Sequence, residues 1–131
     1  MRSPADILRT TNTIALVGAS PNPARPSNQV MRYLLDAGYR VIPVRPAVHE
    51  VLGVPAVAAL ADIDEPVELV NVFRRSEHTP AVARDAVAAG ANALWLQVGI
   101  MSPEARAIAE DGGLDYVENA CTKVVHRLYL A

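Results

Sequence analysis

A chain of 131 residues has the length of one domain, and its 51% hydrophobic and 20% charged residues are typical of a protein with a packed core. The formal net charge of -2 excludes a bulk attraction to nucleic acid or to an anionic membrane. One cysteine excludes an intramolecular disulfide and a zinc site made of cysteines. Because we see neither a signal peptide nor a membrane-spanning run, we expect one cytoplasmic domain over residues 1–131.

The first part of the chain predicts a helix, a strand and a second helix. Ser3, in front of Pro4, is typical of the cap of a short leading helix. The apolar run 13–17 predicts a strand that is buried on both faces of a parallel sheet. Apolar residues at helical spacing within 27–38 then predict a helix that Ser27 caps.

The rest of the chain repeats the alternation of strand and helix. In chain order it predicts a strand at 41–44, a weak helix after Pro55, a strand at 67–73, a helix at 80–89, a strand at 93–98, a helix at 102–112 and a strand at 114–118. The tail from Thr122 fits either a helix or a loop. This alternation predicts an α/β fold, a doubly wound Rossmann-like three-layer sandwich with a five-stranded parallel sheet.

Ligands bind to sheets of this kind beyond the carboxyl ends of the strands, where the strand order reverses. The residues that follow the predicted strands are therefore the candidate binding residues. They are Gly18, Ala19, Ser20, Pro26 and Ser27 after the first strand, Val44 and Arg45 after the second, Phe73, Arg74 and Arg75 after the third, and Gln97 and Gly99 after the fourth.

The loop after the first strand combines a glycine, small residues and the start of a helix. Its backbone N–H groups and the positive end of the helix would suit a pyrophosphate. The dinucleotide fingerprint of three spaced glycines is absent, because Ser20 and Pro23 stand where the second and third glycines are expected. The alternative is that Gly18 only allows a tight turn between strand and helix.

Arg45, after the second strand, indicates the kind of nucleotide. NAD sites have a carboxylate at this position for the ribose hydroxyls, so an arginine disfavours NAD. An arginine suits a ribose phosphate, which both NADP and coenzyme A (CoA) carry. The alternative is a solvated arginine beside a turn.

The third strand is followed by an aromatic residue and two cations. Phe73, Arg74 and Arg75 can lie on an adenine ring and hold phosphate oxygens, with one of the arginines facing the crevice. Ion pairing of these arginines with Glu68 or Glu77 is the competing explanation. Both explanations remain open at the level of sequence.

The remaining residues with chemical potential give weaker signals. We expect Trp95 in the core, and Gln97 can both donate and accept hydrogen bonds at its strand end. The three histidines have no metal-ligand spacing, and no pair of nucleophile and base can be assembled. Cys121 is either a small buried hydrophobic residue or a thiol with a redox role.

Five segments of the chain carry a resemblance to a known family. They are VGASPNP at 17–23, RPS at 25–27, GYRVIPV at 38–44, VFRRSE at 72–77 and LWLQ at 94–97. With them, over about residues 14–126, the chain resembles the small bacterial CoA-binding proteins. Their single domain is similar to the CoA-binding domain of the succinyl-CoA synthetase α subunit.

The resemblance implies that CoA lies across the crevice, with the loop 18–27 at its phosphates and with Arg45, Phe73 and Arg74 around its adenosine end. The family usually has an aspartate and an arginine before the cysteine that matches Cys121, whereas this chain has Asn-Ala there. This departure leaves the function of the fifth strand end open. Ligase activity is not expected, because the phosphorylated histidine of the synthetases belongs to a second domain.

We therefore expect non-catalytic binding of CoA or an acyl-CoA, as a carrier, a sensor or a subunit. A homodimer or an unidentified protein partner is compatible with this role. The alternative is an NADP-linked or acyl-CoA-handling enzyme that a partner chain completes. A purely structural module is the third hypothesis, and it predicts no affinity for nucleotides.

Overall fold

Short apolar runs form the centre of the molecule, because a strand covered on both faces loses the most apolar surface to water. The computed structural model describes residues 1–131. Its main sheet has five parallel strands in the order β2-β1-β5-β6-β7. The strands are β1 (Thr13–Val17), β2 (Arg40–Val44), β5 (Leu69–Val72), β6 (Ala93–Leu96) and β7 (Asp115–Val117). The strand order reverses between β1 and β5, so the predicted doubly wound fold is confirmed.

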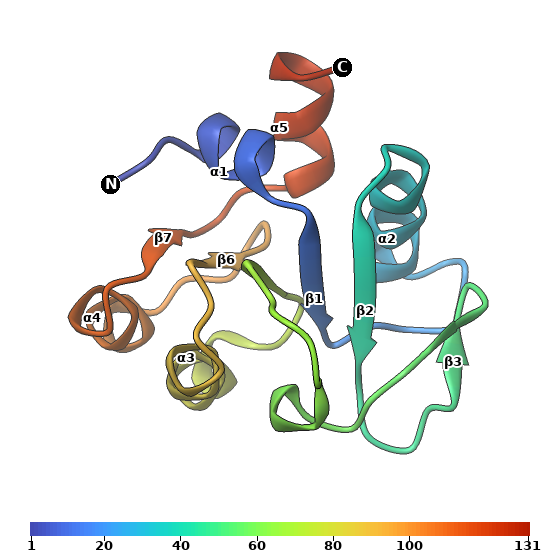
Figure 1. Ribbon diagram of the computed structural model, residues 1–131, viewed down its shortest axis with the longest axis horizontal. Helices are drawn as coiled ribbons and strands as arrows, with labels where there is room; N and C mark the ends of the chain where they lie inside the picture. The colour runs from blue at the N-terminus through green and yellow to red at the C-terminus, as the bar shows by residue number, and fades with distance from the viewer.

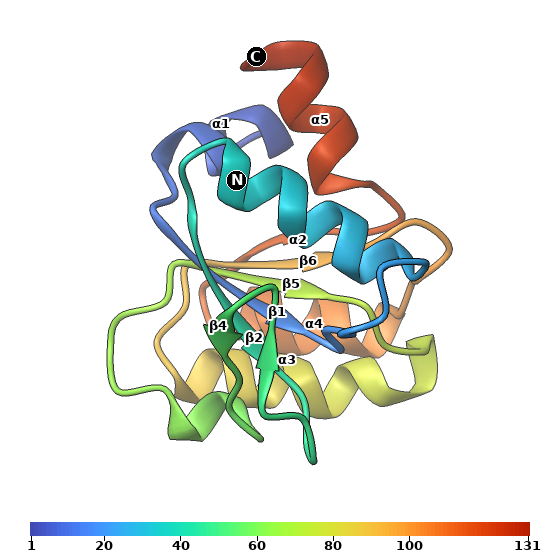
Figure 2. The ribbon, with the colours of Figure 1, turned by 90° about the vertical axis from the view of Figure 1, so that its right-hand side faces the viewer.

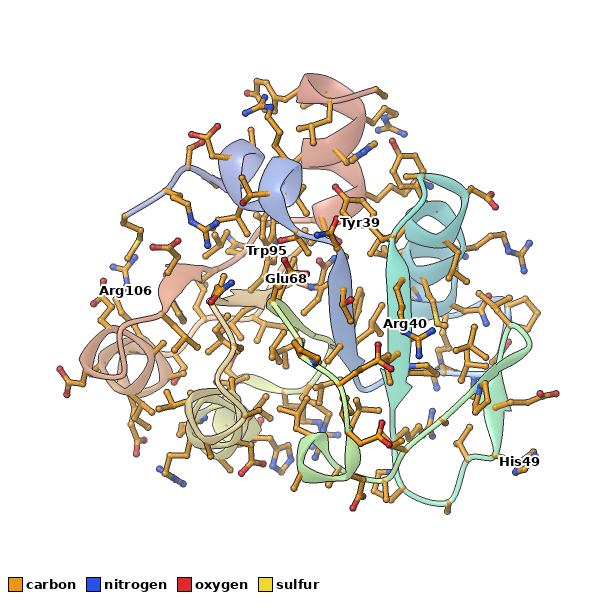
Figure 3. All side chains as sticks on the ribbon, in the orientation of Figure 1. Tyr39, Arg40, His49, Glu68, Trp95 and Arg106 are labelled. Carbon is orange, nitrogen blue, oxygen red and sulfur yellow. The ribbon has the colours of Figure 1, made fainter.

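Helices cover both faces of this sheet and complete the three layers (Figures 1 and 2). On one face lie α1 (Pro4–Thr10), α2 (Pro26–Asp36) and α5 (Thr122–Tyr129), and on the other lie α3 (Thr79–Ala88) and α4 (Pro103–Asp111). Each face has its own hydrophobic core, of 14 and 18 buried residues respectively. Trp95 is 0% exposed and lies inside the molecule as expected (Figure 3), with its Nε1 donating to the carbonyl of Ala120 at 2.9 Å.

The beginnings of two helices test the predicted caps. The Ser3 hydroxyl accepts the N–H of Asp6 at 3.2 Å, so the predicted cap of α1 is confirmed. The predicted cap of α2 at Ser27 is wrong, because the helix begins one residue earlier with Pro26, whose fixed φ suits a first helical position. The Ser27 hydroxyl instead accepts the N–H of Ser20 at 3.1 Å.

The segment after β2 does not contain the predicted helix. It forms a small antiparallel hairpin of β3 (Glu50–Val51) and β4 (Val54–Pro55), followed only by a single 3-10 turn, η1 (Leu60–Asp62). Val57 explains the difference, because its backbone pairs with the edge of β2: its N–H donates to Pro43 and its carbonyl accepts from Arg45. The extended segment pairs with backbone groups at the edge of β2. A helix uses its backbone groups internally and would leave those of β2 without partners.

Two further segments complete the description. A second 3-10 turn, η2 (Ser76–His78), leads from β5 into α3, and the ambiguous tail from Thr122 is the helix α5. β5 and β6 are shorter than predicted and end at Val72 and Leu96. None of the helices combines the length and the apolar character that crossing a lipid bilayer requires.

Candidate functional site

A cleft of about 930 Å³ lies across the carboxyl ends of the strands, at the point where the strand order reverses. Most of the candidate residues predicted from the sequence line it. These are Gly18, Ser20, Pro26, Ser27, Arg45, Phe73, Arg74, Arg75 and Gln97, together with Cys121. The topology therefore brings together residues from five separate loops that are up to about a hundred positions apart.

Three candidates do not line the cleft. Ala19 and Val44 are 1% and 4% exposed and belong to the hydrophobic cores. Gly99 lies on the surface, where its N–H donates to the side chain of Asn119 at 2.8 Å. The structure therefore gives these three residues a role in packing and in loop shape.

Six lining residues are missing from the candidates chosen by sequence. They are Pro21, Asn22, Arg25, Val30, Val98 and Ile100. Arg25 had the clearest available signal, because it is the first residue of the RPS segment in the first loop and is a cation beside a helix start. Val98 is 65% exposed and lies between the candidates Gln97 and Gly99, so its place in the chain was its only signal.

Gly18 allows the ends of β1 and β5 to approach closely. Its φ is +86°, and a Cβ added to it would lie 2.5 Å from the carbonyl oxygen of Phe73. Its own N–H donates to the carbonyl of Val44 at 3.0 Å, and the N–H of Phe73 donates to Val17 at 2.8 Å. The tight-turn explanation therefore holds for Gly18, and its N–H is not available to a ligand.

The loop that follows Gly18 is held in shape by its own polar groups. The amide Nδ2 of Asn28 donates to the carbonyl of Ser20 at 2.9 Å, and the Ser20 hydroxyl accepts the N–H of Asn22 at 3.1 Å. Neither backbone nor side-chain acceptors of the chain bind the N–H of Ser27, in the first turn of α2. Ser27 thus brings a free backbone N–H and the positive end of an eleven-residue helix to the lining of the cleft.

Four arginines line the cleft without a carboxylate partner. Arg25, Arg45, Arg74 and Arg75 form no salt bridge within the chain, and no lining residue is acidic. Arg45 contacts the carbonyl of Ala19 through Nη1 at 3.4 Å. The cleft is therefore a cationic site in a chain whose net charge is negative.

The competing explanation of ion pairing for the third strand end is not observed. Glu68 accepts the backbone N–H groups of Asn12 and Thr13, at the opposite end of the sheet. Glu77 forms no salt bridge. Arg74 and Arg75 both line the cleft, so the expectation that only one of them faces it was wrong.

A buried polar network fixes the orientation of Gln97, which is 5% exposed. Its Oε1 accepts from the Nδ2 of Asn71 at 3.0 Å and from the backbone N–H of Thr122 at 3.1 Å. Because a backbone N–H can only donate, the oxygen of Gln97 must be on this side. Its Nε2 donates to no atom of the chain and belongs to the cleft lining.

Comparison with known proteins identifies the family of the chain. A family model described as a CoA binding domain matches residues 12–127. The chain belongs to this family. The protein YneT of Bacillus subtilis is 42% identical to this chain over 121 residues, which are 92% of this chain and 90% of YneT.

Two solved structures extend the comparison. A protein from Pyrococcus horikoshii OT3 is 38% identical and superposes with a TM-score of 0.95, over 99% of this chain and 94% of its own. The dinucleotide-forming acetyl-coenzyme A synthetase 1 of Ca. Korarchaeum cryptofilum is 25% identical with a TM-score of 0.73, over 85% of this chain and 27% of the synthetase. The fold of this chain thus occurs both in a chain of similar size and as part of a longer one.

Proposed function

We propose that the chain binds CoA or an acyl-CoA without catalysing a reaction, as a carrier, a sensor or a subunit of a larger assembly. The observation that carries this proposal is the cleft with its four unpaired arginines at the switch point of the sheet. Membership of the CoA-binding domain family supports CoA as the nucleotide. The single cysteine fits a reducing cytoplasm as the place of this binding.

The charges of the cleft are unevenly distributed, and this supports one orientation of the ligand. Arg45 follows β2, Arg25 precedes α2, and Arg74 and Arg75 follow β5, so the cations gather at the β2, β1 and β5 ends. CoA carries its 3′-phosphate and pyrophosphate at its nucleotide end. We therefore orient that end toward the arginines, with Arg45 at the 3′-phosphate and the free amide of Ser27 at the pyrophosphate.

The half-buried ring of Phe73 stands beside these cations on the same strand end. An aromatic face next to arginines suits an adenine ring, which stacks while its phosphates are held. We therefore propose that the adenosine lies between the β2 and β5 ends.

The other end of the cleft suits the pantetheine arm. The β6 end contributes Gln97, Val98 and Ile100, and Cys121 closes this part of the lining. These residues carry no formal charge, and the free Nε2 of Gln97 can donate to one of the amide carbonyls of pantetheine. An uncharged arm with amides and a terminal thiol matches such a surface better than a phosphate does.

The lining also supports binding in preference to catalysis. It contains no aspartate, glutamate or histidine that could act as a general base. The side chain of Ser27 is occupied within the loop, where it accepts the N–H of Ser20. An enzymatic role that needs a general base would require groups from a partner chain.

Calorimetric titration tests the proposal with four ligands: CoA, dephospho-CoA, NADP and NAD. We expect CoA to bind best, and the loss of its 3′-phosphate or the substitution Arg45→Ala to weaken binding. Arg84→Ala is the matched control, because Arg84 is an exposed arginine of α3 that forms no salt bridge and does not line the cleft. Tighter binding of NADP would favour a reductase, and no binding by any of the four would reject the nucleotide site.

A further inference from the structure

Gln97 and Cys121 line the part of the cleft that lies at the end of β6. We propose that Cys121 forms a mixed disulfide with CoA when CoA disulfide is present, so that the chain stores CoA covalently under oxidising conditions. This inference rests on the proposed function and deepens it, because it assigns a chemical role to the far end of the same site.

The position of Cys121 is the first observation. Its thiol is free and partly accessible, and it lines the cleft that also contains the four arginines. The neighbouring residues hold it at the end of β6: the N–H of Ala120 donates to the carbonyl of Leu96, and the N–H of Thr122 donates to Gln97. Cys121 is therefore held beside the end of β6, where the proposed binding mode puts the pantetheine arm.

Gln97 supplies the second, independent observation. It is 5% exposed, and its oxygen is saturated by Asn71 and Thr122, which leaves the Nε2 donor without a partner at the cleft. This Nε2 is not a buried atom without a partner, so it is open to the cleft, where it can donate to a ligand in place of water. The amides of pantetheine lie close to the thiol of CoA, so a ligand bound to Gln97 has its sulfur near Cys121.

The distance between the two ends of the cleft agrees with one CoA molecule that reaches both. Arg45 follows β2 and Cys121 lies at the end of β6, three strand spacings apart, which is about 14 Å in a sheet with strands about 4.8 Å apart. The flexible pantetheine arm can cross this distance while the phosphates stay with the arginines. The covalent adduct would therefore use the same contacts as the free ligand.

The reaction is a thiol–disulfide exchange, and CoA disulfide is its only oxidant. The Cys121 thiol loses its proton, and its sulfur attacks one sulfur of CoA disulfide. The bond between Cys121 and that sulfur forms while the disulfide of the reagent breaks. The second CoA leaves as a thiolate and takes up a proton, so one disulfide is exchanged for another and no further electron acceptor is needed.

Intact-mass spectrometry under non-reducing conditions tests the proposal on the full chain. We expect CoA disulfide to add the mass of one CoA, dithiothreitol to remove it, and Cys121→Ser to prevent it. Because binding in the cleft brings the sulfurs together, the reaction should be at least about tenfold faster with CoA disulfide than with pantethine, the same disulfide without the nucleotide. Equal rates with both reagents, or no adduct, would overturn the proposal.

One further variant and a binding measurement separate this proposal from a failure of CoA binding. Gln97→Glu keeps an oxygen for Asn71 and Thr122 but removes the Nε2 donor, so it should slow adduct formation while the chain stays folded. The unchanged chain, kept reduced with dithiothreitol, should bind reduced CoA in the calorimeter. If it binds reduced CoA and forms no adduct with CoA disulfide, the covalent step is wrong and the binding proposal stands; if it binds no CoA, the binding proposal itself is wrong.

Discussion

The arginines at the amino ends of the strands form salt bridges, whereas those at the carboxyl ends do not. At the amino ends of the strands, Arg40 at the start of β2 pairs with Glu65, and Arg2 pairs with Asp115 at the start of β7. The hydrogen bond from Arg40 lowers the pKa of Glu65 and raises that of Arg40. At the carboxyl ends, the cleft contains four arginines and no acidic residue.

This difference is informative about function because neither arrangement contributes much to stability. Exposed ion pairs are worth about 0–1 kcal/mol, and unpaired arginines close to one another repel. A chain with 14 acidic side chains could have paired the cleft cations, as it pairs those at the other end. Cations left without partners around a cleft are typical of a site whose counter-charge comes from the ligand.

The largest expected effect comes from two glycines, one at each end of the sheet. Gly18 and Gly38 both have positive φ, but an added Cβ meets the Phe73 carbonyl oxygen only at Gly18. We expect Gly38→Ala to lower the free energy of unfolding by about 1–2 kcal/mol through backbone strain alone. Gly18→Ala should cost at least about 2 kcal/mol more, because the ends of β1 and β5 must also move apart.

Urea unfolding of both variants measures this difference. Equal losses of stability would mean that the close approach at the cleft is not tight, and that the ends of β1 and β5 can separate freely. CoA affinity should also fall in Gly18→Ala and stay unchanged in Gly38→Ala, since only the former displaces lining residues.

The next effect compares an arginine from each end. Removing a charge-assisted hydrogen bond costs about 1.5–3 kcal/mol, so Arg45→Ala should weaken CoA binding by about tenfold or more. Arg40→Ala should leave CoA affinity unchanged, because Arg40 lies at the amino end and already has a partner. Calorimetry on both variants gives the comparison, and an equal loss in the two would show that only overall charge attracts the ligand.

A smaller effect is expected from salt. The affinity for CoA should fall as ionic strength rises from about 0.05 to about 0.5 M, because screening weakens the attraction between phosphates and arginines. The fall should be shallower for Arg45→Ala, and also shallower for dephospho-CoA with the unchanged chain. If the affinity fell equally steeply with ionic strength in all three combinations, Arg45 would not contact the 3′-phosphate.

The sheet and most of the cleft could be predicted because each depends on local sequence. A buried parallel strand needs a short apolar run, and 13–17 is such a run with limits that match β1. The strand ends then identify Arg45 and Gln97 as neighbours of a common crevice, since the topology of a doubly wound sheet fixes where strand ends meet. The position of both residues at the carboxyl edge of the sheet therefore follows from the fold.

Other features depend on partners far along the chain, and the sequence alone could not supply them. The helix predicted after Pro55 is replaced by an extended segment because Val57 finds backbone partners on β2. The free side of Gln97 is determined by Asn71 and Thr122, which are 26 and 25 positions away. Val44 is buried on the same side of the sheet as Ile42, as the period of two along a strand predicts. Ala19 enters the opposite core directly after Gly18 with its positive φ, and this direction does not follow from the sequence.

The smallest expected effect concerns acid and belongs to the amino end. Because Arg40 lowers the pKa of Glu65 in the folded chain, the pair adds stability above the ordinary glutamate pKa of about 4.3 and loses it as the pH falls through the lower folded value. Glu65→Gln should therefore be slightly less stable than the unchanged chain at pH 6, and the two should converge near pH 3. Thermal unfolding at both pH values measures this. A difference that grows in acid would mean that Glu65 is destabilising when ionised, and the distinction between paired and unpaired ends would then rest on the cleft alone.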